Sequence, residues 1–417
     1  MSLSAEKKYN YQNYILSFLW LSGTVKAFLN TFLFEFDWTA LAMIIACVDM
    51  GYCIATRRIS ITAQSSQYLA VILLIYAWIL FSNLYSASDT FKFEKSGLFI
   101  ANIIFFLYPL FVKEVNFKTI ITVYTIVLLP FALFFIYMRA IMWELDSPVV
   151  ALFMNMRMQY LTVGFQLGFM FILLLYEPKK VWRILVVFLL LLASSARGPL
   201  LFTVLILLVI GFNKLLSLKH NSTRFNLKYL PRFAALLSVP VIITTLFWER
   251  FTFLFHVAIY RFSSLGSGQD ASALERIEMM KFAFFTPFET LSSWLAGYGI
   301  GSFGNKFAGF DGRMYPHNLF LEVFFELGII GIVLFCVLII MAFRNFSLRS
   351  GPIFPLFLFA FLNAMKSNTI TDLWILFSLM GLLSKQNALS MIPRWKGLSY
   401  VTNQLSEKSG KLKFLFR

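Results

Sequence analysis

His317 is the residue in this sequence best suited to acid–base chemistry. It lies between Pro316 and Asn318 at the start of a long apolar stretch, and it is one of 3 histidines in the 417 residues. An unperturbed imidazole titrates near neutral pH, so it can accept or release a proton under physiological conditions. The position therefore indicates a proton-transfer group at the beginning of a membrane helix.

Two acidic residues extend the same pattern into the apolar stretch. Glu322 and Glu326 follow Asn318 at a spacing that places all three residues along one stripe of a helix. A carboxylate inside a membrane segment is costly to bury and commonly serves function. We expect one of them to hold a proton, to orient a partner or to pair with an arginine, in support of His317.

A second helix start with related chemistry lies at Ala196-Arg197-Gly198-Pro199. Proline is favoured in the first turn of a helix, where free N–H groups and the helix dipole attract anions. Arg197 at one helix start and His317 at the other would suit a diphosphate at the outer membrane surface. The alternative for Arg197 is a long side chain that covers apolar surface and extends its charge to the interface.

Metal and nucleotide chemistry fit the sequence less well. The three histidines, His220, His256 and His317, do not share a metal-ligand spacing, and no Asp-x-Asp motif occurs, so we expect no metal or other cofactor. The segment 297–304 contains G-x-G-x-x-G, but no βαβ pattern surrounds it. We interpret this segment as a mobile loop of close backbone approach, with ligand binding by exposed amides as the alternative.

The composition indicates a polytopic membrane protein. Hydrophobic residues make up 59% of the chain and charged residues 13%, with a mean hydropathy of +0.76, whereas a soluble domain carries about a quarter charged residues. We predict an all-α fold with about twelve transmembrane helices. The predicted segments lie near 14–33, 38–56, 67–87, 96–113, 119–138, 159–176, 182–195, 198–213, 233–248, 318–343, 352–366 and 370–384.

Basic residues set the predicted orientation. Most of the 36 lysines and arginines fall on one side of the membrane when both termini are cytoplasmic, as the positive-inside rule requires. His317 is then external. Lys26 and Asp49 are opposite charges at membrane depth, and we expect a structural ion pair between them, with a polar channel as the alternative.

Residues 1–417 form a single predicted membrane domain with two distinct parts. The loop 249–317 is the long external segment, and we expect short helices in it. The tail 385–417 is basic, which favours contact with anionic lipid on the cytoplasmic face over nucleic-acid binding. In the loop, Ser272 and Glu275 match a capping box that would open a helix ending at Pro287. Its apolar face would lie along the membrane surface, with members at Leu274, Ile277, Met280 and Phe284.

The external loop and the helix after it resemble the signature region of the bacterial O-antigen ligase and O-antigen polymerase superfamily. The ligase pattern is His, then Asn, Ser or Gln, nine residues, Gly, two residues, and Gly, Thr or Tyr. This sequence fits the pattern at His317, Asn318, Gly328 and Gly331. The glycine-rich segment, Arg276 and Arg197 are similar to further family features, although an alanine separates Ser195 from Arg197, where the family has Ser-Arg-Gly.

This resemblance implies a metal-independent GT-C-type glycosyltransferase in the bacterial inner membrane, with its active site facing the periplasm. The donor would be a glycan on undecaprenyl diphosphate, and the acceptor a hydroxyl on a second lipid-linked repeat or on lipid A–core. His317 would be the general base of an inverting displacement, supported by Asn318, Glu322 and Glu326. The diphosphate would be bound by external arginines, namely Arg197, Arg276, Arg261 and Arg313.

Polymerase and ligase are alternatives within this superfamily. The 50 phenylalanines suit an AT-rich gene in a polysaccharide cluster, which favours the repeat-unit polymerase. Membrane lipids are expected partners, a chain-length regulator is a further candidate partner, and nucleic acid is not expected. A lipid-linked sugar transporter is an alternative class, but the longest loop is external and no repeated half occurs. A non-catalytic scaffold would leave His317 and the two glutamates unexplained.

Overall fold

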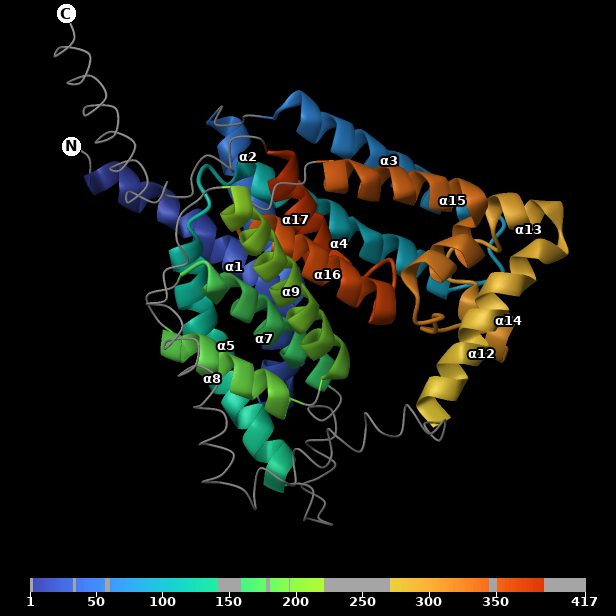
Figure 1. Ribbon diagram of the computed structural model, residues 1–417. Helices are drawn as coiled ribbons and strands as arrows, with labels where there is room; N and C mark the ends of the chain where they lie inside the picture. The colour runs from blue at the N-terminus through green and yellow to red at the C-terminus, as the bar shows by residue number, and fades with distance from the viewer. Residues whose placement is uncertain are drawn as a thin grey trace, which may run out of the picture.

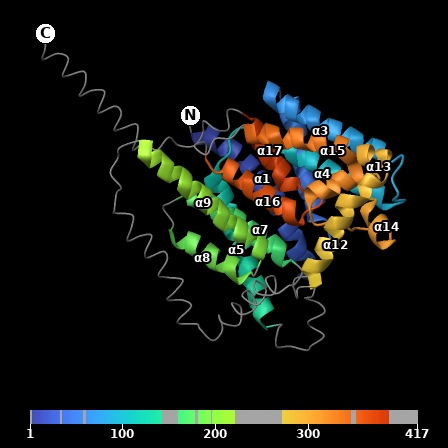
Figure 2. The same cartoon turned by 45° about the vertical axis from the view of Figure 1, so that its right-hand side comes forward.

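The computed structural model describes residues 3–32, 35–56, 61–141, 159–177, 181–194, 196–220, 271–344 and 351–385 (Figures 1 and 2). Within these ranges every regular element is a helix, in agreement with the predicted all-α class. The longer helices are α1 Leu3–Phe32, α2 Trp38–Ala55, α3 Ala63–Ser82, α4 Phe91–Phe111, α5 Phe117–Ile141, α7 Tyr160–Leu175, α8 Val181–Ala193, α9 Arg197–His220, α15 Leu319–Arg344, α16 Ile353–Ser367 and α17 Trp374–Ser384. Between α9 and α15 lie α12 Ala271–Phe285, the 3₁₀ helix η2 Thr286–Glu289, α13 Leu291–Ala296 and α14 Phe303–Ala308.

Five of the described helices are long and apolar enough to cross a membrane. They are α2, α3, α4, α15 and the part of α5 over residues 117–137. Shorter apolar helices overlap five more of the predicted segments, and the segment near 14–33 overlaps α1, which is not among these candidates. The segment near 233–248 and nearly all of the tail 385–417 lie outside the described residues. The helices support a multi-pass membrane protein, whereas twelve crossings and their orientation stay predictions.

The helices α12, α13 and α14, with η2, form a small helical lobe (residues 271–308) at one end of the bundle (Figures 1 and 2). The lobe packs against the beginning of α15, and α15 also packs against α3 and α16. Its buried contacts are aromatic: the Phe282 ring of α12 lies 6.1 Å from Phe303 of α14 and 5.7 Å from Phe325 of α15, between centroids. This packing holds α12, which carries Arg276, beside the start of α15.

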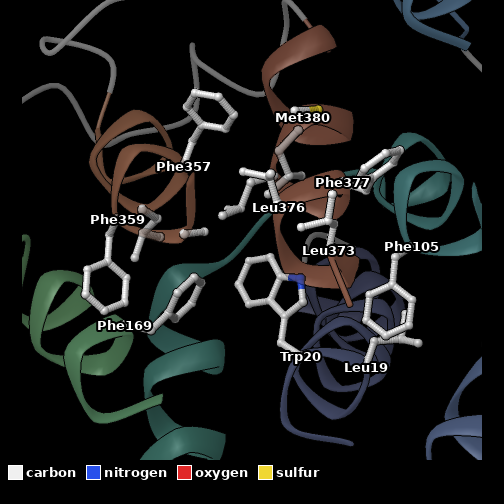
Figure 3. Packing of buried hydrophobic residues seen from close by; sticks show 14 of the residues in the cluster. Leu19, Trp20, Phe105, Phe169, Phe357, Phe359, Leu373, Leu376, Phe377 and Met380 are labelled. Carbon is white, nitrogen blue, oxygen red and sulfur yellow. The ribbon is translucent and has the colours of Figure 1, made fainter. Parts of the chain in front are cut away.

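Trp20 of α1 lies in the core of the helix bundle. Its side chain is 1% exposed, and its indole nitrogen donates a 2.7 Å hydrogen bond to the Ser378 hydroxyl of α17. Figure 3 shows the indole close to Leu376 of α17 and to Phe169 of α7, whose ring packs edge-on at 5.2 Å. The indole therefore buries a large apolar area with its one polar atom satisfied, and it joins the first helix to the last described one.

α15 is kinked at Gly328. This glycine has φ 66° and ψ −165°, a backbone conformation that strains any residue with a Cβ. A kink removes the helical partners of the carbonyls that precede it, and these need other donors when buried. Three donors at 2.9–3.0 Å replace them: the N–H of Tyr298 for Phe325, the N–H of Gly299 for Glu326, and the indole of Trp78 for Leu327.

The glycine-rich loop between α13 and α14 supplies two of these donors. Gly297, Gly299 and Gly301 all have positive φ, and a Cβ at Gly297 would come within 2.4 Å of the Glu326 carbonyl carbon. The predicted close backbone approach is thus confirmed. Ligand binding by the amides of residues 297–302 is excluded, because each of these N–H groups donates within the protein, whereas binding by the amides of Phe303 and Gly304 stays a prediction. The acceptors lie on Ser293, Phe325, Glu326 (carbonyl and carboxylate), Ser82 and Gly299.

The predicted ion pair between Lys26 and Asp49 is wrong. Lys26 pairs with Asp37 at 2.9 Å, and both side chains are largely exposed. Asp49 lies roughly 18 Å farther along α2 than Asp37, given the rise of an α-helix, and so is out of reach of Lys26. It is buried and accepts hydrogen bonds from neutral groups, the side chains of Tyr11, Gln12 and Tyr108.

The capping box predicted at Ser272 and Glu275 is also wrong. α12 begins at Ala271, so Ser272 lies inside the helix, and a capping box is formed by Thr290 and Ser293 at the beginning of α13. The end of α12 follows the prediction, since Pro287 lies in η2. Leu274, Ile277 and Phe284 are exposed on α12, while contact of this face with a membrane stays a prediction.

Substitution of the kink glycine should destabilise the protein. A Cβ at Gly328 would lie 2.3 Å from the Leu295 carbonyl oxygen and would require an unfavourable positive φ. We expect Gly328→Ala to lower the free energy of unfolding by roughly 1–3 kcal/mol, measured as a lower unfolding temperature of the purified protein in detergent. Gly51→Ala in α2 is the matched control, because no atom lies within 4 Å of its Cβ position. Equal unfolding temperatures for the two variants would contradict this account of the kink.

Candidate active site

His317 lies in the connection that enters α15. Asn318 is the cap of this helix: its carbonyl accepts the N–H of Glu322 at 3.0 Å, and its side-chain oxygen accepts the N–H of Leu321 at 3.1 Å. Pro316 lies before the cap, farther from the helix than predicted. Among the described residues, His317 is the one non-glycine residue with positive φ, at 53°. Such a conformation persists where the surroundings impose it, and it is frequent at functional sites.

The imidazole of His317 is half-buried beside the ring of Tyr315. The two ring centroids are 4.6 Å apart. Burial and, as a second cause, the positive charge of Arg276 lower the pKa of His317 from 6.5 to about 4. The imidazole is therefore neutral at physiological pH and has an unprotonated nitrogen that can accept a proton.

Two cationic side chains from other helices lie within electrostatic range of Lys366, and one of them, Arg276, also acts on His317. Arg276 lies on α12, Arg197 begins α9, and Lys366 lies in the last turn of α16. Arg276 acts electrostatically on both His317 and Lys366, and Arg197 also acts on Lys366. A Cβ at Gly198 would lie 3.2 Å from the Lys366 ammonium, so the start of α9 meets the end of α16. Because like charges repel, this arrangement favours a bound anion.

Arg313 and Asp372 form a salt bridge at the edge of these cations. Arg313 is 60% exposed, and Asp372 lies in the connection between α16 and α17. The Asp372 carboxylate offsets the charge of Arg313. The pKa of Tyr315 is raised, by burial first and then by Asp372, so this phenol is protonated at neutral pH. Arg261 lies outside the described residues, and its role stays a prediction.

Glu322 and Glu326 are buried, and both pair with Lys95 of α4. The Lys95 ammonium contacts a Glu322 oxygen and lies 2.8 and 2.7 Å from the two Glu326 oxygens. All three side chains are at most 2% exposed. The arginine partner that the sequence suggested as one option is therefore a lysine, contributed by a distant part of the chain.

Neutral donors complete the contacts of the two carboxylates. Glu322 accepts a hydrogen bond from the Thr369 hydroxyl and one of 3.0 Å from the N–H of Ile370. Glu326 accepts a hydrogen bond from the N–H of Gly301 in the glycine-rich loop. The stripe of carboxylates thus contacts α4, the α16–α17 connection and the glycine-rich loop.

Lys95 and Lys366 are the two site residues that sequence reasoning missed. Lys95 directly precedes the predicted segment 96–113, which assigns it to a loop, whereas α4 begins at Phe91 and includes it. Its helical spacing to Phe99 and Asn102, which are also buried, is a signal that could have found it. Lys366 carries no local signal, because only the packing of α16 against α9 brings it to the other cations.

Comparison with known families gives an independent indication. A family model described as O-antigen ligase matches residues 182–336, the region that contains Arg197, Arg276, His317 and Gly328. The match supports the O-antigen ligase and polymerase superfamily. Comparisons with curated proteins and with solved structures gave no match. Lys95 and Lys366 lie outside the matched region, so only the tertiary structure shows that these two side chains lie close to the candidate site.

The superfamily indicates a glycosyltransferase-like membrane enzyme that acts on lipid-linked glycans. Whether such an enzyme polymerises repeat units or ligates the glycan is not distinguished by the match. Within the described ranges, no group of three or more His, Cys, Asp or Glu side chains is arranged to hold a metal ion. Metal independence stays a prediction.

The low pKa of His317 predicts an unusual pH dependence of its chemical reactivity. Diethylpyrocarbonate modifies neutral imidazole, so the modification rate of His317 should stay constant between about pH 5 and 8, whereas that of a free histidine falls as pH drops through about 6.5. Mass spectrometry resolves the modified peptide. Arg276→Gln removes one cause of the shift and should move the midpoint upward. A midpoint near 6.5 in the unaltered protein would contradict the proposed environment of His317.

Proposed function

We propose that the protein transfers a glycan from undecaprenyl diphosphate to an acceptor hydroxyl at the periplasmic face of the bacterial inner membrane. The observation that carries this proposal is a neutral His317 beside Arg276, which in turn lies within electrostatic range of Lys366, as does Arg197. Glycosyl transfer from a lipid diphosphate needs both a proton acceptor and a site for a polyanion. The match to the O-antigen ligase family supports the same reaction class.

The three cations bind the donor diphosphate in this proposal. A guanidinium can donate two parallel hydrogen bonds to phosphate oxygens, and the ammonium of Lys366 adds a mobile point charge. The beginning of α9 contributes the positive end of its helix dipole next to Arg197. As the glycosidic bond breaks, negative charge grows on the leaving diphosphate, and the cations stabilise that charge. Arg313 and Arg261 remain proposed contacts of the diphosphate.

His317 acts as the general base. Its unprotonated nitrogen takes the proton of the acceptor hydroxyl while the hydroxyl oxygen bonds to the anomeric carbon of the donor sugar. The bond from that carbon to the diphosphate oxygen breaks, and undecaprenyl diphosphate leaves with the bonding electron pair. This single displacement inverts the anomeric configuration and uses no metal. Bound diphosphate would offset the charge of Arg276, which raises the pKa of His317 toward the range of an effective base.

The supporting residues act through the backbone of α15. Asn318 caps the helix that begins directly after His317, and Glu322 and Glu326 fix that helix to its neighbours. None of the three needs to contact substrate. This assigns Asn318, Glu322 and Glu326 to positioning, and proton transfer to His317 alone.

Variants of the base and of the anion site should lose transfer activity. We expect His317→Gln and Arg276→Gln each to lower the single-turnover rate with purified lipid-linked donor by roughly 100-fold or more. Lys281→Gln is the matched control for Arg276→Gln, because Lys281 is an exposed residue on the same helix. Its rate should stay within about twofold of the unaltered protein, as is usual for surface changes. Full transfer by a correctly inserted His317→Gln protein would refute the assignment of the base.

The acceptor separates the two activities of the superfamily. Our first expectation is the polymerase, so purified protein supplied with lipid-linked repeat units alone should form longer lipid-linked chains. Product that forms only after lipid A–core is added would establish the ligase instead. Movement of lipid-linked sugar across proteoliposomes with no glycosyl transfer to either acceptor would exclude both activities and favour a transporter.

A further inference from the structure

The buried cluster of Lys95, Glu322 and Glu326 takes no direct part in the proposed reaction, although Glu322 lies in the first turn of the helix that follows His317. Two carboxylates face one ammonium, so the cluster carries an excess negative charge when all three groups are ionised. A buried charge is very costly unless hydrogen bonds compensate it. The hydrogen bonds from neutral donors to the two carboxylates are therefore important for the stability of the cluster.

Two of these donors belong to the connection between α16 and α17. The Thr369 hydroxyl and the Ile370 N–H both donate to Glu322, one to each carboxylate oxygen. The carbonyl of Ile370 accepts a 2.8 Å hydrogen bond from the Asn102 amide of α4. Ile370 is thus fixed on both sides, by α15 through Glu322 and by α4 through Asn102.

Lys366 lies a short distance along the chain from this fixed point. The N–H of Asn368 still bonds to the Ala364 carbonyl at 3.2 Å, which continues the helical pattern past Lys366. A displacement of residues 369–370 would therefore be transmitted to the end of α16. Arg197 and Arg276 both repel the Lys366 ammonium, so the end of α16 would move away from the other cations if its anchor were lost.

We infer that Glu322 is a positioning residue of the anion site. Its carboxylate holds the α16–α17 connection against the start of α15, and this connection in turn holds Lys366 in place. The inference rests on the proposed function, in which Lys366 binds the donor diphosphate. Lys95 is the buried counterion of Glu322. Glu322 acts through Thr369 and Ile370 and contacts no substrate.

Glu322→Gln is the variant that isolates this role. All partners of the Glu322 carboxylate are donors, so one of them must face the amide NH₂ group of a glutamine. The ammonium of Lys95 favours the glutamine oxygen, which turns the NH₂ group toward the N–H of Ile370. Lys95 keeps Glu326 as an ionic partner, so the variant should fold. Glu94→Gln is the matched control, because Glu94 is an exposed glutamate next to Lys95 on α4.

Hydrogen exchange tests the structural half of the inference without any activity. In Glu322→Gln, the amides of residues 366–373 should exchange at least about tenfold faster, because a charge-assisted hydrogen bond of Ile370 is lost. Glu94→Gln should leave this exchange unchanged. Unchanged exchange in a folded Glu322→Gln protein would overturn the inference, whether or not the protein is a glycosyltransferase.

Kinetics test the functional half. Lys366→Met should lower kcat/KM for the lipid-linked donor about tenfold, as expected for the loss of one charge-assisted contact. Glu322→Gln should cause a similar loss, and Lys366→Met should have little further effect in the Glu322→Gln background. Glu322→Asp should restore part of the activity. If the double variant loses kcat/KM by the product of the two single losses, the two residues act independently and the inference is overturned. Absence of transfer by the unaltered protein would count against the proposed function, and hydrogen exchange would then decide the inference alone.

Discussion

The buried contact of Lys95 with Glu322 and Glu326 is the interaction on which the arrangement of this region depends. It places one ammonium and two carboxyl groups in the interior, where each would be far less stable without the others and without hydrogen bonds. The cluster joins α4 and α15 directly, and through its neutral donors it reaches the α16–α17 connection and the glycine-rich loop. The hydrogen-bond partners of these buried charges are all present when the helices pack in this arrangement. This requirement is a physical basis for a well-defined site geometry.

The backbone of α15 adds a second constraint at Gly328. The kink releases carbonyls that must find donors, and the glycine-rich loop and Trp78 provide them. The same loop donates to Glu326, so the kink and the charge cluster hold the same segment of chain. The lobe that carries Arg276 is thereby fixed to the helix that follows His317. Glycine is required on both sides of this contact because the two backbones lie too close for a Cβ.

The candidate chemistry depends on keeping like charges together while a neutral imidazole lies beside them. Arg276 disfavours protonation of His317 and also repels Lys366. Both effects would be relieved by a bound diphosphate, since its negative charge interacts favourably with all of these groups. Arg276 therefore disfavours protonation of the base, and binding of an anionic donor would increase the basicity of His317.

The sequence by itself determined the all-α membrane class and most of the segments that form the helices, and it supplied three candidate residues of the proposed site. These follow from local signals: apolar runs of membrane length, His317 before an apolar helix, and Arg197 at a second helix start, with Arg276 and the glycine pattern supplied by family resemblance. Charge partners could not be predicted in this way. Lys26 pairs with Asp37 rather than Asp49, and Glu322 and Glu326 pair with Lys95. Only the tertiary structure decided these pairs and the place of Lys366, because contacts between helices depend on packing and depth, which no local spacing records.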